Sequence, residues 1–310
     1  MSGGGGGRYF SRGQGPGEIR QALREQEERE KNQAFESRVS TALGELLSEY
    51  SARDTAAVSK TLDQITKALE SDIEGSVDPV FGGSVRKHTY VDGISDVDSL
   101  VVLKDPQLRS MSPQQVLDYF EEKLRKALPS CEVRRGQLAV TVTDGELQIQ
   151  LLPAVKESDR YYIASAAGDS WSKVNPHGFF RQLTRANERA GMKLVPTIKL
   201  VKAINQAFPP DLRLTGYHLE SLAVEAFRQY DGPYNTKAML QHFFEDARTR
   251  VAKPITDKTG QSVHVDEYLG AANSERRQLI SAALDRVLRR MKNADASRSV
   301  EQWLRLWGDE

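Results

Sequence analysis

Two aspartates separated by one residue are the side chains in this sequence best suited to hold a metal ion. Asp96 and Asp98 stand at the start of an apolar run, Val97 to Leu103, that is rich in β-branched residues and predicts a strand. Alternate side chains of a strand point to one face, so the two carboxylates are expected to project together. Neighbouring carboxylates repel each other unless a cation lies between them, and Mg²⁺ prefers oxygen ligands shared with substrate phosphates. The pair therefore predicts a site for Mg²⁺ or Mn²⁺.

A glycine-serine turn lies upstream of this pair, with Ser84 twelve residues before Asp96. Gly83 allows a phosphate to approach the backbone closely, and Ser84 adds a hydroxyl to the backbone N–H groups of the turn. Alone, such a turn or an Asp-x-Asp pair is common on protein surfaces. Together, on neighbouring strand ends, they form the phosphate and metal sites that phosphoryl transfer requires.

Composition limits the class of protein. The chain has 310 residues with 43 basic and 43 acidic side chains, which argues against a globally basic nucleic-acid binder. Its single cysteine, Cys131, excludes an internal disulfide framework and is typical of a reducing compartment. No apolar run approaches the roughly 18 residues that span a bilayer, and Met1-Ser2 followed by five glycines is no signal peptide. We expect a soluble cytoplasmic protein without membrane contact.

The elements that position the site follow from hydrophobic periodicity. Residues 1–17 are Gly-rich and predict a disordered tail, and the charged and amphipathic stretch after it predicts a long helix and then a second one. Ser112-Pro113 begins a capped helix, and Asp144-Gly145 joins two alternating segments as a hairpin. We predict an α/β protein of two lobes. Residues 18–155 form a catalytic lobe with a mixed sheet and the long N-terminal helix, and residues 156–310 form a mostly helical lobe.

The signature around Gly83-Ser84 and Asp96-Val97-Asp98 resembles that of the polymerase-β-like nucleotidyltransferases. Four later motifs narrow the resemblance to the bacterial cGAS/DncV-like nucleotidyltransferases (CD-NTases): Leu151-Leu152-Pro153-Ala154, Lys193-Leu194-Val195-Pro196 with Lys199 and Lys202, Gly216-Tyr217-His218-Leu219-Glu220, and Asp266-Glu267-Tyr268-Leu269-Gly270 followed by Asn273-Ser274. The resemblance covers roughly residues 75–310.

This resemblance implies a two-lobed fold that binds nucleotides in the cleft between the lobes. Such proteins join nucleoside triphosphates (ATP, GTP or others) into cyclic di- or trinucleotides, and many act in cyclic-oligonucleotide-based antiphage defence, where the product activates an effector. Carried over by position, Gly83 and Ser84 hold the donor triphosphate while Asp96 and Asp98 ligate the metal.

Three further residues carry over to nucleotide binding. Lys199 and Lys202, three residues apart and hence on one helix face, reach the phosphates. Tyr217 stacks on a base.

One position departs from the family pattern. The resemblance implies a third carboxylate where this chain has Gln150, a neutral side chain that is a poor Mg²⁺ ligand and a poor base. Three accounts remain open: a working two-carboxylate site, an altered mechanism, or an inactive nucleotide-binding sensor. We favour activity because both aspartates and the phosphate turn are intact.

The remaining candidates have ordinary structural explanations. The five histidines lack the spacing of zinc ligands, and Cys131 is expected to be a small buried hydrophobe. The arginine pairs at 134–135, 276–277 and 289–290 are expected on solvated faces. A linear oligonucleotide synthetase, a catalytically inactive nucleotide-binding module and a nucleic-acid-binding protein with an incidental Asp-x-Asp remain the alternatives.

Overall fold

The computed structural model describes residues 16–51, 60–61, 63–67, 70, 77–80, 97–103, 108, 110–136, 138–145, 147–158, 160–165, 168–255 and 265–308. The side chains at 77–80, 97–99, 147 and 176 are outside this description. Three predicted site residues, Gly83, Ser84 and Asp96, also lie outside the described residues, as does the predicted tail up to residue 15. For Asp98, the description is limited to its backbone.

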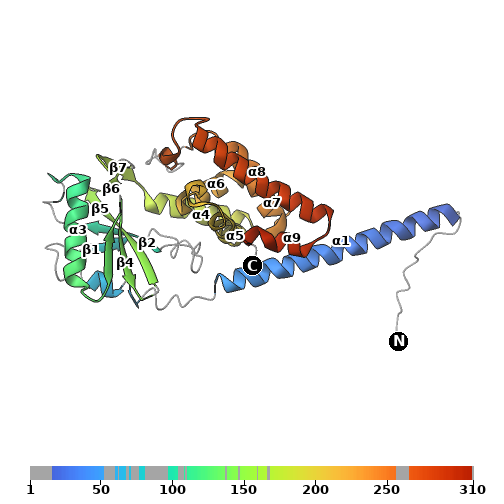
Figure 1. Cartoon of the computed structure of the whole chain (residues 1–310), viewed down its shortest axis with the longest axis horizontal. Coiled ribbons are helices and arrows are strands. Elements are labelled where there is room, and N and C mark those ends of the chain that lie inside the picture. The colour runs from blue at the N-terminus through green and yellow to red at the C-terminus, as the bar shows by residue number, and fades with distance from the viewer. Residues whose placement is uncertain are drawn as a thin grey trace.

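A seven-stranded mixed sheet forms one lobe of the molecule (Figure 1). Its strands are β1 (Val77–Val80), β2 (Val97–Leu103), β3 (Glu132–Arg135), β4 (Val140–Asp144), β5 (Leu147–Glu157), β6 (Arg160–Ala164) and β7 (Trp171–Val174). Five strands follow the order β1-β2-β5-β4-β3, and β6 and β7 extend the sheet from the C-terminal end of β5. The pairing of β2 with β5 is parallel and the other pairings are antiparallel.

Helix α3 (Pro113–Ala127) covers one face of this sheet. Its apolar stripe packs against alternate residues of the central strands, including Val101 and Leu103 of β2 and Ile149 and Leu151 of β5. The intervening positions form a second cluster on the opposite face, where Leu100, Val102 and Ala154 are buried against Leu152, Tyr161 and Ile163. Both faces of β2 and β5 are therefore apolar, as expected for a buried parallel pair.

Two local predictions are confirmed. Ser112 caps α3 in a reciprocal capping box with Gln115, and Pro113 takes the first helical position. Asp144 pairs with Leu147 across a turn in which Gly145 has a φ of 61°, a left-handed conformation that glycine adopts without strain.

Six α-helices form the core of the second lobe: α4 (Pro176–Arg189), α5 (Leu194–Gln206), α6 (Gly216–Ala226), α7 (Thr236–Arg250), α8 (Glu275–Ala296) and α9 (Val300–Leu304). Short 3-10 turns lie between α5 and α6 (Pro210–Leu212), between α7 and α8 (Glu267–Leu269) and after α9 (Arg305–Trp307). Helix α5 is buried on nearly every side. The predicted two-lobed α/β class is confirmed. The strands β6 and β7 continue the sheet to Val174, beyond the predicted boundary at residue 155.

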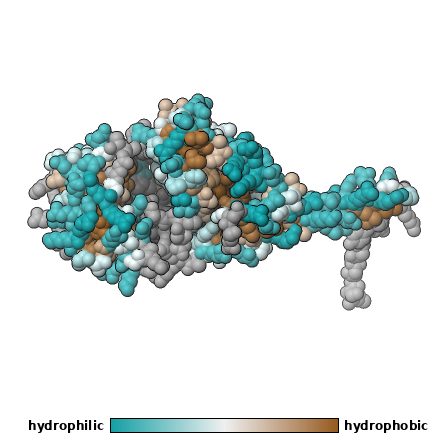
Figure 2. Space-filling model, viewed as in Figure 1, coloured by the Kyte–Doolittle hydropathy of each residue, from teal (hydrophilic) through white to brown (hydrophobic). Residues whose placement is uncertain are grey.

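Helix α1 (Pro16–Glu49) belongs to the helical lobe in its C-terminal half and projects beyond it in its N-terminal half (Figure 1). Phe35, Val39 and Leu43 are buried in the core of the helical lobe. Lys237 of α7 secures this half, because its ammonium pairs with Glu36 of α1 and with Asp295 of α8. The projecting half presents mainly hydrophilic residues (Figure 2). Pro16 and Gly17, which were assigned to the tail, begin the helix.

Replacing Ser112 by alanine should lower the free energy of unfolding by about 1 kcal/mol, because the first turn of α3 loses its side-chain cap. Urea unfolding followed by circular dichroism measures this change. Ser48→Ala in the exposed surface of α1 is the matched control and should change stability by less than about 0.5 kcal/mol. Equal effects of the two substitutions would contradict the importance of the cap.

Candidate active site

Strands β2 and β5 pair in a register that places Asp98 beside Gln150. In the parallel pair, Asp98 of β2 is the backbone partner of Gln150 of β5, and on its other side Gln150 pairs with Thr141 of β4. The position predicted for the third carboxylate is thus adjacent to a predicted metal ligand, although the two are 52 residues apart in sequence. Asp96 directly precedes β2 and lies outside the described residues.

Gln150 occupies the face of the sheet that α3 leaves uncovered. It alternates with Ile149 and Leu151, which pack toward α3, and shares its parity with Leu152. Its side chain is partly buried, whereas Gln148 two residues earlier is exposed. The structure therefore places an amide where the family resemblance implies a carboxylate, and its role remains a prediction.

The two lysines of α5 have different partners. Lys202 is 5% exposed, and its ammonium lies 2.9 Å from the carboxylate of Glu220 in α6, which is 1% exposed. This amine also lies against Gly216, where an added Cβ would stand 3.5 Å from Nζ. Lys199 is partly buried and donates to Ser51 Oγ at 2.9 Å. Burial, together with the charge of Lys202, lowers the pKa of Lys199.

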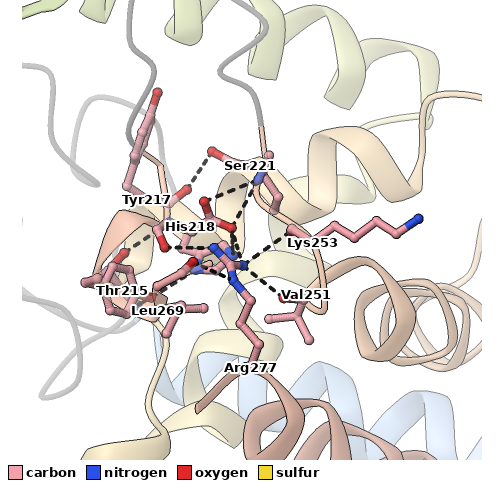
Figure 3. A network of polar contacts seen from close by, with 12 residues as sticks. Thr215, Tyr217, His218, Ser221, Val251, Lys253, Leu269 and Arg277 are labelled. Carbon is pink, nitrogen blue, oxygen red and sulfur yellow. Dashed lines mark hydrogen bonds and ion pairs between the residues drawn. The ribbon is translucent and has the colours of Figure 1, made fainter. Parts of the chain in front are cut away.

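Tyr217 lies in the first turn of α6, directly after the residues that begin the helix. Thr215 is the N-cap and its hydroxyl accepts from the backbone N–H of His218 at 3.2 Å. The ring of Tyr217 makes an edge contact with Phe179 of α4, with 4.7 Å between centroids. Figure 3 shows its side chain pointing away from the polar network beneath it. Tyr217 and the ammonium of Lys202 therefore both lie at the N-terminal end of α6.

That polar network was missed by sequence reasoning. It joins the side chain of His218 to three side chains that lie 48 to 59 residues later in the sequence, Asp266, Tyr268 and Arg277. Figure 3 shows this network around His218 and Arg277. The expectation that Arg277 lies on a solvated face is wrong, because its side chain is completely buried. The available signal was the resemblance of the Asp266–Gly270 segment to the family's C-terminal region.

Arg277 is the centre of this network. Its guanidinium forms an ion pair with the buried carboxylate of Asp266 at 2.7 Å. Its other hydrogen bonds go to backbone carbonyls at Val251, Lys253, Asp266 and Gly270. The carboxylate in turn accepts from the backbone N–H of Ile255. Two loops and the start of α8 are therefore held by one cation.

His218 is neutral in this network. Burial lowers its pKa to about 4; the charge of Arg277 adds to this shift, and that of Asp266 opposes it. The Tyr268 hydroxyl accepts from the Thr215 N–H at 3.2 Å and lies 2.9 Å from His218 Nδ1. The Asp266 carboxylate, 3.9 Å from Nε2, favours the imidazole proton on Nε2, which leaves Nδ1 to accept the hydroxyl proton of Tyr268. Nε2 has no hydrogen-bond partner among the described residues.

Residues 37–187 match the family model of the SMODS domain, which is described as a Second Messenger Oligonucleotide or Dinucleotide Synthetase domain. A search of the curated proteins found no match.

Solved CD-NTase structures share the fold. Escherichia coli MS115-1 CdnC with ATP superposes with a TM-score of 0.66 at 17% identity, covering 88% of this chain and 97% of that one. Rhodothermus marinus CdnE c-UMP-AMP synthase with Apcpp and Upnpp gives 0.56 at 20% identity, covering 78% and 94%. Escherichia coli DncV in its 3'-deoxy GTP bound form gives 0.59 at 13% identity, covering 92% and 88%.

The family model and the shared fold confirm the resemblance to the bacterial cGAS/DncV-like nucleotidyltransferases. The family model supports second-messenger nucleotide synthesis as the general activity, and the solved structures support the fold. Within the described part of the chain, no group of three or more His, Cys, Asp or Glu side chains is placed to hold a metal. No described helix combines the length and apolar character needed to cross a membrane.

Acidification should destabilise the protein through His218. The unfolded chain binds a proton at this residue near pH 6.5, but the folded chain binds it only near its pKa of about 4. This contribution to stability is therefore present above about pH 6.5 and declines by up to about 1.4 kcal/mol per pH unit as the pH falls toward 4.

Urea unfolding at about pH 7 and about pH 5.5 measures this loss. His218→Asn retains an acceptor for Tyr268 but cannot titrate, so the pH-dependent loss in the variant should be smaller by about 1 kcal/mol. Identical pH dependence in both proteins would show that His218 is not the titrating group.

Proposed function

We propose that this protein is a metal-dependent nucleotidyltransferase that joins nucleoside triphosphates into a cyclic di- or trinucleotide and releases pyrophosphate. The observation that carries the proposal is the parallel pairing of β2 with β5, which brings Asp98 beside Gln150 within a matched SMODS domain. We further propose that the product activates an effector in cyclic-oligonucleotide-based antiphage defence in the cytoplasm.

Each predicted site residue has a role in this proposal. Gly83 and Ser84 bind the donor triphosphate, and Tyr217 stacks on a base through the ring that it presents at the start of α6. Of the two lysines, Lys199 is the one that contacts phosphate in this proposal, because Lys202 is already paired with Glu220. Lys202 contributes through its ion pair with Glu220 and its contact at Gly216, which help to hold the end of α6 that carries Tyr217.

The donor set suits a hard divalent cation. Asp96 and Asp98 supply carboxylate oxygens, and Gln150 adds a neutral amide oxygen next to Asp98. Mg²⁺ or Mn²⁺ at these residues would neutralise phosphate charge and make the acceptor hydroxyl more acidic.

The reaction balances without a covalent enzyme intermediate. An acceptor ribose hydroxyl attacks the α-phosphorus, the new P–O bond forms as the bond to pyrophosphate breaks, and the hydroxyl proton passes to solvent water. Gln150 cannot take this proton, because an amide is not a base at neutral pH. A second transfer within the linear product closes the ring.

Two alternatives are retained. A linear oligonucleotide synthetase would perform one type of transfer without ring closure. A catalytically impaired nucleotide-binding sensor is favoured specifically by the amide at Gln150, since it would bind nucleotide yet release little pyrophosphate.

Mass spectrometry after incubation with all four nucleoside triphosphates and Mg²⁺ or Mn²⁺ tests this function. A cyclic product resistant to phosphatase is expected, and Asp96→Ala with Asp98→Ala should abolish it because the metal loses both carboxylates. A phosphatase-sensitive product would indicate the linear synthetase, and nucleotide binding without product would indicate the sensor. Undiminished product in the double variant would refute the assignment of the two aspartates.

Substituting Gln150 by aspartate should strengthen metal binding, because a third carboxylate would stand beside Asp98. We expect the Mg²⁺ concentration for half-maximal nucleotide binding to fall roughly tenfold. Gln148→Asp is the matched control, since it adds the same charge two residues away on an exposed position. Equal effects of both substitutions would mean that Gln150 does not line the metal site.

A further inference from the structure

We propose that Tyr268 is a positioning residue for the nucleotide base, because its hydroxyl fixes the turn of α6 that carries Tyr217. The inference rests on the proposed function and adds a residue to it that does not itself touch the nucleotide. Tyr268 lies 51 residues beyond Tyr217, in the 3-10 turn Glu267–Leu269.

The hydroxyl of Tyr268 contacts the two residues on either side of the Gly216-Tyr217 pair. It accepts from the backbone N–H of Thr215 at 3.2 Å and bonds to Nδ1 of His218 at 2.9 Å. The N–H belongs to the N-cap and the imidazole to the first helical turn. One oxygen atom therefore restrains both ends of the four-residue segment that presents Tyr217.

The phenol is held in the protonated form that this arrangement needs. A phenolate would lack the proton that His218 Nδ1 accepts, and burial raises the pKa of Tyr268. The Tyr268 ring also meets the imidazole edge-on, with 5.9 Å between centroids, and the guanidinium of Arg276 lies 5.5 Å from the ring centroid. These contacts fix the direction of the hydroxyl.

The turn that carries Tyr268 is itself anchored on both sides. Asp266 precedes it and Gly270 follows it, and the backbone carbonyls of both accept from Arg277 at 3.1 and 3.0 Å. The carboxylate of Asp266 is paired with the same guanidinium at 2.7 Å. The hydroxyl is thus fixed relative to α8, and its contacts fix the start of α6 relative to α8 as well.

Tyr217 is also held by contacts outside this turn, and the turn adds to them. Its carbonyl accepts from Ser221 Oγ at 2.8 Å, which holds the backbone inside the helix. Its ring contacts Phe179 by one edge. A loosened N-cap would let the ring sample other directions, so fewer molecules would present it ready to stack, and the apparent affinity for the base would fall.

The test uses Tyr268→Phe in the full chain, which removes one oxygen and retains the ring. Tyr230→Phe is the matched control: the Tyr230 hydroxyl donates to the Pro233 carbonyl at 2.9 Å, in the loop between α6 and α7. Equilibrium dissociation constants are measured with Mg²⁺ for non-hydrolysable analogues of all four nucleoside triphosphates and for inorganic tripolyphosphate.

Tyr268→Phe should weaken the preferred nucleoside triphosphate roughly tenfold and change tripolyphosphate affinity less than about twofold, since only the base is affected. Tyr230→Phe should change neither. In the Tyr217→Ala background, Tyr268→Phe should cause no further loss, because the residue through which it acts is absent. Hydrogen exchange at the amides of residues 215–218 should accelerate in Tyr268→Phe alone.

Several results would overturn the proposal: unchanged nucleotide affinity in Tyr268→Phe, equal losses for nucleotide and tripolyphosphate, additive losses in the double variant, or unchanged exchange at residues 215–218. Failure of nucleotide binding itself is a separate result, because the unsubstituted protein would then bind none of the four analogues. Failure of catalysis alone is separated by the product assay, since a sensor would bind an analogue but form no product.

Discussion

A guanidinium in the interior of a protein must be paired and fully hydrogen-bonded, and the helical lobe is organised around that requirement. Arg277 meets it with the carboxylate of Asp266 and four backbone carbonyls. Removing one partner of such a buried pair typically costs about 3–5 kcal/mol, because the other charge is left uncompensated. The loops around residues 251–255 and 266–270 therefore have little freedom to rearrange independently of α8.

The sheet lobe positions its residues by a different principle. Parallel pairing of β2 with β5 requires a long crossover, which α3, β3 and β4 supply. Because both faces of the two strands are apolar, a slip of one residue would exchange the clusters on the two faces. The register that brings Asp98 beside Gln150 is thus determined by packing along the rest of the strands.

Local signals in the sequence predicted the elements well. The cap at Ser112 and the turn at Gly145 depend on neighbouring residues, and both were confirmed. The burial of Arg277 could not be predicted in this way. Adjacent arginines are usually solvated, and the partner that makes burial possible is a carboxylate from a separate loop.

The lysines of α5 show the same limit. Their spacing of three residues correctly predicts a shared helix, but not that α5 is buried on nearly every side. Identifying Glu220 as the partner of Lys202 requires the packing of α5 against α6, which no local pattern specifies.

The burial of Lys202 has a consequence for the charge balance of the proposed site. A nucleoside triphosphate brings several negative charges, and Lys202 offers little net charge against them because Glu220 lies 2.9 Å away. Lys199 is the remaining cation on this helix face, and its partial burial already disfavours the charged amine.

Asp96 and Asp98 add two further negative charges, and Gln150 adds none. Under the proposed function, the divalent cation therefore supplies positive charge that the two lysines described on α5 do not. A neutral third position lowers the negative charge that this cation must balance, and it also weakens the hold on the metal. With an amide at Gln150, the proposed site is therefore one in which metal affinity depends on bound nucleotide.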